Sequence, residues 1–339
     1  MKNSINSRKI GVTELEVTSL GFGAAPIGDL FQKLAEPEAE SILNAAWNSG
    51  IRYFDTAPFY GHGKSELRVG QFLRQKDRDE FVLSTKVGRV LRAPKDPANF
   101  KSDFWIDAIF DFQFDYTYDG VMRSFEDSLQ RLGLNRIDVL LIHDLDPWFH
   151  GPDVFNAYFG QLLSGGYQAL QDLKNSGAIR AFGAGVNLPG TIPKFLDSMD
   201  LDLFIVAMPY TLLDQGALDS EFPRCADRSV GIVIGSPFAS GILATGPIEG
   251  AVYGYKPASP EIMEKTCRIA SVCKKHGVSL RSAAMQFPLA HPIVAAIIPG
   301  SIKPEYLPTN RDDFIREIPS GLWDELRKDG LIREDAPTP

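Results

Sequence analysis

Residues 51–66 of this 339-residue chain, IRYFDTAPFYGHGKSE, contain the clearest indication of its fold. Their run of aromatic and apolar residues ends at Asp55, and Tyr60 follows closely. Two later stretches repeat the pattern, because the apolar run of FVLSTKVG leads to Lys86 and that of IDVLLIHD leads to His143. Since the carboxyl ends of the strands in a barrel meet at one end, we expect these four side chains to converge in an active site.

Short apolar runs alternate with stretches of helical period, and this alternation is typical of a parallel sheet. The runs predict eight strands, at Leu20–Ala24, Tyr53–Ala57, Val82–Val87, Ile137–His143, Ala181–Asn187, Leu203–Met208, Gly231–Ser236 and Ala295–Pro299. The stretches between them predict helices at Pro37–Ser49, Ser65–Arg74, Asp119–Leu132, Gly166–Ser176, Ile192–Met199, Ala217–Arg228, Pro260–His276 and Glu305–Ile315. Eight β/α units predict a (β/α)8 TIM barrel, an α/β fold, as a single domain over residues 1–339.

Three further segments complete the predicted architecture. RKIGVTELEVT, residues Arg8–Thr18, predicts an N-terminal β-hairpin before the barrel. Arg89–Tyr118 follows the third strand and Leu145–Ser164 follows the fourth, and both are too long for ordinary connections. Because both leave the carboxyl ends of strands, we expect two long loops that form walls of a substrate pocket.

Composition excludes several classes of protein. The net charge is −8, with 35 basic against 43 acidic residues, and without a basic block the sequence argues against nucleic acid and anionic membranes as partners. No apolar run approaches the ~20 residues of a membrane span. The start MKNSINSRKIG lacks an apolar signal segment, so we expect a cytoplasmic protein. The three cysteines suggest neither disulfides nor zinc, and the oligomeric state is not readable from the sequence.

Three motifs and one cluster of side chains come close to known ligand sites. GHGKS at 61–65 ends like a phosphate-binding loop, but the first glycine of that motif would fall on Pro58. Neither GFGAAP at 21–26 nor GAGVNL at 183–188 completes the glycine fingerprint of a Rossmann site. A metal-like cluster comprises His143, Asp144, Asp146 and His150. It lacks a helical histidine pair, and neighbours on a strand point to opposite faces, so we expect no metal.

The four residues at the strand ends suit proton transfer to or from a carbonyl or hydroxyl oxygen. A free tyrosine ionises near pH ~10. A lysine ammonium beside the phenol lowers that pKa, and a carboxylate keeps the lysine charged, which are the roles that fit Lys86 and Asp55. A histidine at the next strand end can orient the substrate oxygen. The alternative is a structural Asp–Lys pair with an unrelated tyrosine and histidine, but four such residues in this order favour the catalytic interpretation.

Along nearly its whole length the chain resembles the aldo-keto reductases. The resemblance lies in GVTELEVTSLGFG (11–23), YFDTAPFYGHGKSE (53–66), STK (84–86), RLGLNRIDVLLIH (131–143), SPFASGIL (236–243) and IIPGS (297–301). It implies that Asp55, Tyr60, Lys86 and His143 are the catalytic tetrad, with Tyr60 as general acid and base. It also implies an extended nicotinamide cofactor at the carboxyl end of the barrel without a Rossmann fold.

The resemblance implies the cofactor contacts residue by residue, at Gly23, Asn187, Ser236, Phe238, Ser240, Gly300, Ser301, Lys303 and Asn310. Asn187 matches the asparagine that holds the nicotinamide carboxamide, whereas Gly235 replaces a tyrosine that stacks on the nicotinamide in many members. Gly300 and Tyr306 stand where members that prefer NADP place a lysine and an arginine on the 2′-phosphate. Without these two cations the negative charge of a 2′-phosphate has little compensation. Lys303 can replace them only in part, because a lysine ammonium binds phosphate less directionally than an arginine guanidinium. We therefore predict that the protein prefers NAD to NADP.

The phrase LLIHDLDPWFHG, residues 140–151, resembles the branch of the family that contains L-fucose dehydrogenase, D-threo-aldose 1-dehydrogenase and pyridoxal 4-dehydrogenase. This branch oxidises hemiacetals to lactones. The resemblance therefore predicts a dehydrogenase that acts on the C1 hydroxyl of an aldose such as L-fucose or D-arabinose. The alternatives are pyridoxal oxidation to 4-pyridoxolactone, an NADPH-dependent aldehyde or ketone reductase, and a cofactor-sensing binding subunit like the potassium-channel β-subunits.

Residues around the tetrad suggest substrate contacts. Asp144 and Asp146 can accept hydrogen bonds from sugar hydroxyls or, equally, cap the following segment. Aromatic side chains that can bound a ring-shaped substrate, or simply pack, are Phe59, Trp105, Trp148 and Phe149.

Overall fold

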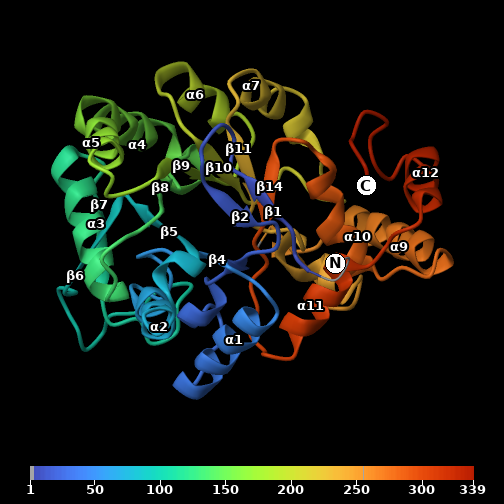
Figure 1. Ribbon diagram of the computed structural model, residues 1–339, viewed down its shortest axis with the longest axis horizontal. Helices are drawn as coiled ribbons and strands as arrows, with labels where there is room; N and C mark the ends of the chain where they lie inside the picture. Colours follow the sequence, from blue (N-terminus) through green and yellow to red (C-terminus); the bar gives the residue numbers. More distant parts are fainter. Residues whose placement is uncertain (1–3, 255) are drawn as a thin grey trace.

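The computed structural model describes residues 4–254 and 256–339, and eight parallel strands form its central sheet (Figure 1). The strands are β3 (Phe22–Gly23), β4 (Tyr53–Asp55), β5 (Val82–Val87), β8 (Val139–His143), β9 (Ala181–Val186), β10 (Leu203–Val206), β11 (Gly231–Ile234) and β14 (Val294–Ile297). They pair in chain order from β3 to β14. A parallel bridge between Leu20 and Ile297 joins the two edges, and the Gly21 N–H donates to the Ile297 carbonyl at 2.8 Å. The predicted (β/α)8 barrel is therefore confirmed.

Helices follow the strands around the outside of the sheet (Figure 1). They are α1 (Glu36–Asn48), α2 (Lys64–Leu73), α3 (Tyr118–Leu132), α4 (Pro147–Gln161), α5 (Tyr167–Asn175), α6 (Thr191–Ser198), α7 (Glu221–Asp227), α8 (Ile242–Thr245), α9 (Pro260–Lys275), α10 (Leu280–Gln286), α11 (Tyr306–Ile315) and α12 (Ser320–Lys328). Within the described residues, every helix is too short or too polar to cross a lipid bilayer.

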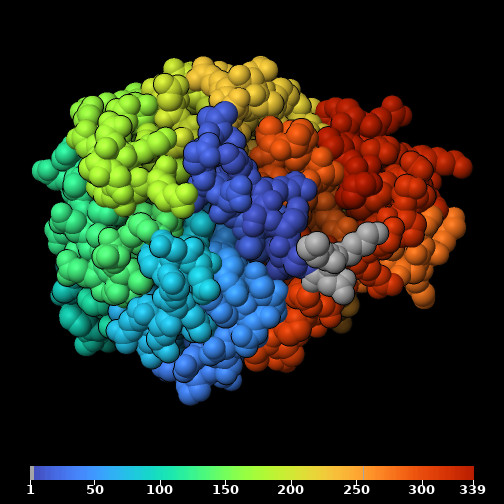
Figure 2. Space-filling model, viewed as in Figure 1, coloured from blue at the N-terminus to red at the C-terminus, as the bar shows by residue number. Residues whose placement is uncertain are grey.

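The predicted N-terminal hairpin seals one end of the barrel. It consists of β1 (Ser7–Lys9) and β2 (Glu16–Thr18), which pair antiparallel. Ile10, Leu15 and Val17 are buried in one apolar cluster with residues from the barrel strands. Figures 1 and 2 show this hairpin, in dark blue, across the face of the barrel that is turned toward the viewer. Because the hairpin covers the amino ends of the strands, a binding site has to lie at the opposite, carboxyl end.

The prediction of two long loops is wrong in part. Arg89–Tyr118 contains an antiparallel hairpin of β6 (Arg89–Arg92) and β7 (Asp111–Phe114), joined by a long connection. Leu145–Ser164 is mostly the helix α4, which a π-helical turn at Leu162–Gly166 links to α5. Gly151, with φ of 70°, breaks α4 just before Pro152, and this Gly-Pro pair favours a loop in the sequence although the chain resumes its helix.

Two other helices differ from expectation. α7 begins at Glu221 instead of Ala217, because Gly216–Leu218 forms a separate 3-10 turn. α10 lies between α9 and β14 and was not predicted at all. Its buried residues include two alanines, Ala283 and Ala284, and such small residues produce a weak helical pattern. A short hairpin of β12 (Val252–Tyr253) and β13 (Lys256–Pro257) follows α8.

Candidate active site

Three strands bring the predicted tetrad together at the carboxyl end of the barrel. Asp55 is the last residue of β4, Lys86 lies near the end of β5, and His143 is the last residue of β8. The Lys86 ammonium donates to Asp55 Oδ2 at 2.7 Å and to the Thr56 carbonyl at 2.8 Å. Ser84 donates to the other carboxylate oxygen, Asp55 Oδ1, at 2.7 Å. Lys86 and Asp55 are both buried, so this ion pair is shielded from solvent.

Tyr60 lies in the turn after β4, against both Lys86 and His143. The Lys86 Nζ atom is 4.6 Å from the centroid of the Tyr60 ring. The rings of Tyr60 and His143 are 5.6 Å apart and nearly perpendicular. The structure thus brings all four predicted residues together, and their catalytic roles remain a prediction.

His143 lies in surroundings that disfavour its charged form. Burial, followed by the nearby charges of Arg89 and Lys86, holds the pKa of His143 well below its ordinary value. The imidazole is therefore neutral at physiological pH and can hydrogen-bond an oxygen without adding charge.

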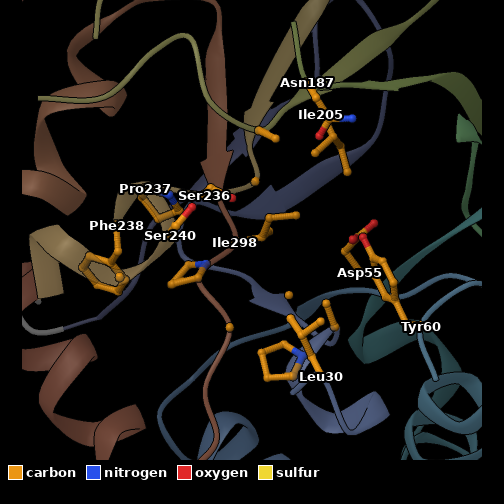
Figure 3. A pocket seen from close by; sticks show the side chains of 18 of the residues that line it. Leu30, Asp55, Tyr60, Asn187, Ile205, Ser236, Pro237, Phe238, Ser240 and Ile298 are labelled. Carbon is orange, nitrogen blue, oxygen red and sulfur yellow. The ribbon is translucent and has the colours of Figure 1, made fainter. Parts of the chain in front are cut away.

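A cavity of about 790 Å³ opens beside these four residues. Its walls come from the carboxyl ends of the strands and from the segments that follow them (Figure 3). Asp55 and Tyr60 lie on one side in Figure 3, and the segment from Ser236 to Ser240 after β11 lies across from them. The predicted cofactor residues that line this cavity are Gly23, Asn187, Ser236, Phe238, Ser240, Gly300, Ser301 and Asn310.

The segment after β11 has an unusual backbone. Ala239 and Ser240 have φ of 48° and 63°, and Gly241 follows with φ of 113°. Residues with side chains seldom adopt this left-handed conformation, and such strain clusters at ligand sites. Left-handed residues can also turn backbone N–H groups into a concave anion site. The N–H groups of Ala239 and Gly241 already donate within the segment, so Ser236 and Ser240, at the same wall, are the residues that fit a phosphate-bearing nicotinamide nucleotide.

Lys303 is the exception among the predicted cofactor residues. Its side chain is exposed, it does not line the cavity, and its ammonium lies 5.7 Å from the centroid of the Tyr306 ring. Its backbone carbonyl accepts a hydrogen bond from Ser301 at 2.8 Å, which fixes the turn but directs nothing toward the cavity. Of the predicted cofactor residues, Lys303 is therefore the one that the structure does not place at the cavity, and its contact stays a prediction.

Gly235 is the position at which the sequence resemblance implies a stacking tyrosine. A Cβ atom there would lie 3.2 Å from Ile205 Cγ2. Ile205 and Ile298 both line the cavity beside it, and Figure 3 shows both side chains at its edge. At this place the wall is therefore aliphatic.

The predicted substrate contacts also line the cavity, but two acidic residues have other partners. Phe59, Trp105, Trp148 and Phe149 are all part of its wall. Asp144 is 7% exposed and forms an ion pair with Arg89, at 3.1 Å from Nη2 to Oδ2. Asp146 caps α4, because its Oδ1 accepts from the backbone N–H groups of Trp148 and Phe149. A role for Asp144 in accepting sugar hydroxyls is thus disfavoured, since its carboxylate is already engaged inside the protein.

Two arginines near the cavity were not predicted from the sequence as site residues. Arg281, on α10, lines the cavity and pairs with Asp313 on α11 at 2.7 Å. Arg89 is buried and holds Asp144. Arg89 follows Lys86 by only three residues, and this position in the sequence could have indicated that it lies near the site. Arg281 lies in α10, the helix that was not predicted from the sequence. Among the described residues, no group of three or more His, Cys, Asp or Glu side chains is arranged to hold a metal ion.

The lowered pKa values of four histidines make the stability of the fold depend on pH. Burial lowers the pKa of four of them below 6.5, namely His62, His143, His150 and His291. When the folded-state pKa is lowered, the unfolded chain binds protons more readily. The contribution to stability is then fully present above pH ~6.5 and is lost as the pH falls toward the folded-state pKa.

We therefore expect the Tm of the wild-type protein to fall as the pH is lowered from about 7 to about 5. The Tm of the His143→Gln variant should fall less steeply over the same range. Thermal unfolding followed by circular dichroism checks this, and parallel curves for the two proteins would contradict it.

Comparisons with known proteins show to which family the chain belongs. Residues 19–328 match the model of the Aldo/keto reductase family. The chain is 40% identical to the D-threo-aldose 1-dehydrogenase of a Pseudomonas species, over 96% of both chains. It is 41% identical to the pyridoxal 4-dehydrogenase of Microbacterium luteolum, over 96% of this chain and 97% of that protein.

Solved structures show the same fold at lower identity. An aldo-keto reductase from Bacillus halodurans, in its holo form, aligns over 97% of both chains with a TM-score of 0.74 and 23% identity. The glycerol dehydrogenase of Gluconobacter oxydans gives the same coverage and TM-score at 20% identity. From the family match and the two relatives at about 40% identity, the chain belongs to the aldo/keto reductase family.

Proposed function

We propose that this protein is an NAD-dependent dehydrogenase that oxidises the hemiacetal hydroxyl of a small cyclic substrate to a lactone. The observation on which the proposal rests is the cluster of Tyr60, His143 and the Lys86–Asp55 pair at one end of the cavity. Family membership supports an oxidoreductase. Both relatives at about 40% identity are dehydrogenases by name, one of an aldose and one of pyridoxal.

Each residue of the cluster has a separate role in this proposal. Tyr60 takes the proton from the hemiacetal hydroxyl. Lys86, charged beside Asp55, favours the phenolate form of Tyr60 that can accept this proton. His143 is neutral and hydrogen-bonds the same oxygen, which orients the hydroxyl toward Tyr60. When bound, a nicotinamide nucleotide supplies the acceptor for the hydride that leaves the hemiacetal carbon.

An aldose such as L-fucose or D-arabinose is our first choice of substrate, and pyridoxal is the second. The second candidate is favoured by the aromatic walls around Tyr60. The Phe59 and Trp105 rings are perpendicular at 5.4 Å, and Phe59 lies 6.5 Å from Phe149. Such walls suit a flat aromatic ring, but aromatic faces also bind the apolar faces of sugars, so both rings fit.

The function is tested by following NADH production at 340 nm with L-fucose, D-arabinose, L-galactose, D-glucose and pyridoxal as substrates. We expect turnover with at least one of them, and a lactone as the product in mass spectrometry. No turnover with any substrate, with either NAD or NADP, would defeat the proposal.

We expect the preference for NAD to be at least about tenfold in kcat/KM, because the two cations that would compensate a 2′-phosphate are missing. The Pro26 ring opposes a side chain at Gly300, since a Cβ atom there would lie 2.6 Å from Pro26 Cγ. Among the described residues of the cavity wall, Arg281 is the one arginine or lysine besides Lys86, and Asp313 already pairs with it. Steady-state kinetics with both cofactors measure the ratio.

Three substitutions sharpen this test. Tyr306→Arg restores one missing cation and should improve kcat/KM for NADP more than for NAD. Lys303→Ala should leave the ratio unchanged, because Lys303 lies outside the cavity wall. A wild-type preference for NADP would contradict the prediction, and if Arg281→Ala abolished that preference, Arg281 would be the phosphate contact instead.

A further inference from the structure

A buried guanidinium lies beneath the reacting end of the cavity. Arg89 is 1% exposed and follows directly after the tight turn at Gly88. A Cβ atom at Gly88, whose φ is 105°, would lie 2.2 Å from the Tyr116 ring, so the turn requires glycine. The turn places Arg89 among aromatic rings of β7, α4 and the β4 turn. The Cζ atom lies 4.2 Å from the ring centroid of Phe59, 4.9 Å from that of Phe114 and 5.0 Å from that of Phe149.

Arg89 has one strong electrostatic partner. None of its three side-chain nitrogens has a hydrogen-bond acceptor within the described residues, and its ion pair is with Asp144, at 3.1 Å. Aromatic faces stabilise a buried cation in part. A buried charge without a counter-charge costs several kcal/mol, roughly, so Arg89 and Asp144 depend on each other.

Asp144 contacts both Asn187, which is expected to bind the cofactor, and His143, which is expected to bind the substrate. Its Oδ1 accepts from Asn187 Nδ2 at 2.8 Å, and its Oδ2 lies 3.3 Å from His143 Nε2. Its backbone is left-handed, with φ of 47°, at the end of β8. Strain of this kind persists where the surroundings require it.

The carboxylates around Asn187 determine which way its amide is turned. Nδ2 of Asn187 donates to Asp144 and also to Asp146 Oδ2, at 3.2 Å. An ionised carboxylate can only accept, so the NH₂ group has to face it and the amide oxygen is left for the cavity. Figure 3 shows Asn187 at the cavity edge. A protonated Asp144 could donate to the amide oxygen instead and allow the opposite orientation.

We propose that Arg89 and Asp144 act as a positioning pair, which holds the amide of Asn187 with its oxygen toward the cavity and thereby sets the affinity for the nicotinamide carboxamide. The inference rests on the proposed function, since it assumes that the cavity binds a nicotinamide nucleotide. Burial raises the pKa of Asp144, and the charge of Arg89 opposes that rise, which supports a carboxylate that depends on Arg89 to stay ionised.

A double-mutant cycle tests the coupling between Asp144 and Asn187. The four proteins are wild type, Asp144→Asn, Asn187→Ala and the double variant. Each is titrated with NADH without substrate, and binding is followed by NADH fluorescence. We expect Asp144→Asn to raise the NADH Kd about tenfold in the wild-type background and to have no further effect in the Asn187→Ala background. An equal rise in both backgrounds, or no rise, would overturn the inference.

Two further variants separate positioning from stability. Asp146→Ser keeps a capping oxygen for α4 but removes one contact to Asn187, and we expect a smaller rise in Kd, about twofold. Arg89→Met with Asp144→Asn removes both charges together, so no lone charge remains buried. We expect this pair to keep a nearly wild-type Tm while the Kd rises as in Asp144→Asn. A pair variant that binds NADH as tightly as wild type would overturn the inference even if Asp144→Asn alone failed to fold.

Failure of this inference and failure of the proposed function give different results. The titration needs no substrate and no turnover. A wild-type protein that bound neither NADH nor NADPH would overturn both, whereas tight binding with an additive cycle would overturn the positioning pair alone.

Discussion

Tyr60→Phe is expected to lower kcat by on the order of 10³-fold while NADH binding persists. The substitution removes one oxygen, the proposed acceptor of the substrate proton, and leaves the ring. The ring makes the contacts that hold its place, with Trp105 at 5.7 Å and His143 at 5.6 Å between centroids. Turnover is measured with the substrate found in the screen, and binding is measured by fluorescence titration.

The matched control is Tyr118→Phe, which also removes a single hydroxyl. Tyr118 is 38% exposed and donates to Asp172 at 3.1 Å, away from the cavity wall. Its loss should leave kcat within about twofold of wild type, since surface substitutions of this kind have small effects. If Tyr60→Phe kept most of its rate, Tyr60 would not be the acid and base, and another group would have to take the proton.

Lys86→Met is expected to lower both activity and stability. The Lys86 ammonium is buried against Asp55 at 2.7 Å, and its loss leaves the carboxylate buried and uncompensated. Breaking a buried pair in this way costs about 3–5 kcal/mol of unfolding free energy. Without the cation beside its ring, less of Tyr60 is in the phenolate form that can take the proton, so kcat should fall at least about 10²-fold.

The double variant Lys86→Met with Asp55→Asn separates these two effects. Removing both charges avoids the lone carboxylate, so much of the lost stability should return. Activity should not return, because the proposed role of the ammonium toward Tyr60 is still missing. Urea unfolding gives the free energies, and a double variant that regained both stability and activity would show that the pair is structural.

The sequence allowed the barrel to be predicted because most of its strands are short runs buried on both faces. β5 and β9, for example, are buried along their whole lengths, and such runs stand out against the amphipathic helices between them. α4 was missed although Asp146 and Pro147 form a normal helix start. The Gly151–Pro152 break and the aromatic residues around it obscured the helical period.

Residues of the site could be predicted where a polar side chain stands at the end of an apolar strand, as for Lys86 and His143. It was not predictable where a partner depends on tertiary packing. Nothing in the local sequence indicates that Arg89 pairs with Asp144, because the rings of β7 and α4 create the buried environment that joins them. Similarly, Arg281 reaches the cavity because α10 packs on α11 next to Asp313.

The bridge between Leu20 and Ile297 has a consequence for the synthesis of the chain. Until β14 leaves the ribosome, the edges of β3 and β11 have no partners, and unpaired edges of this kind promote aggregation. β3, the first strand of the barrel, therefore lacks its second neighbour, β14, until nearly the whole chain has been synthesised.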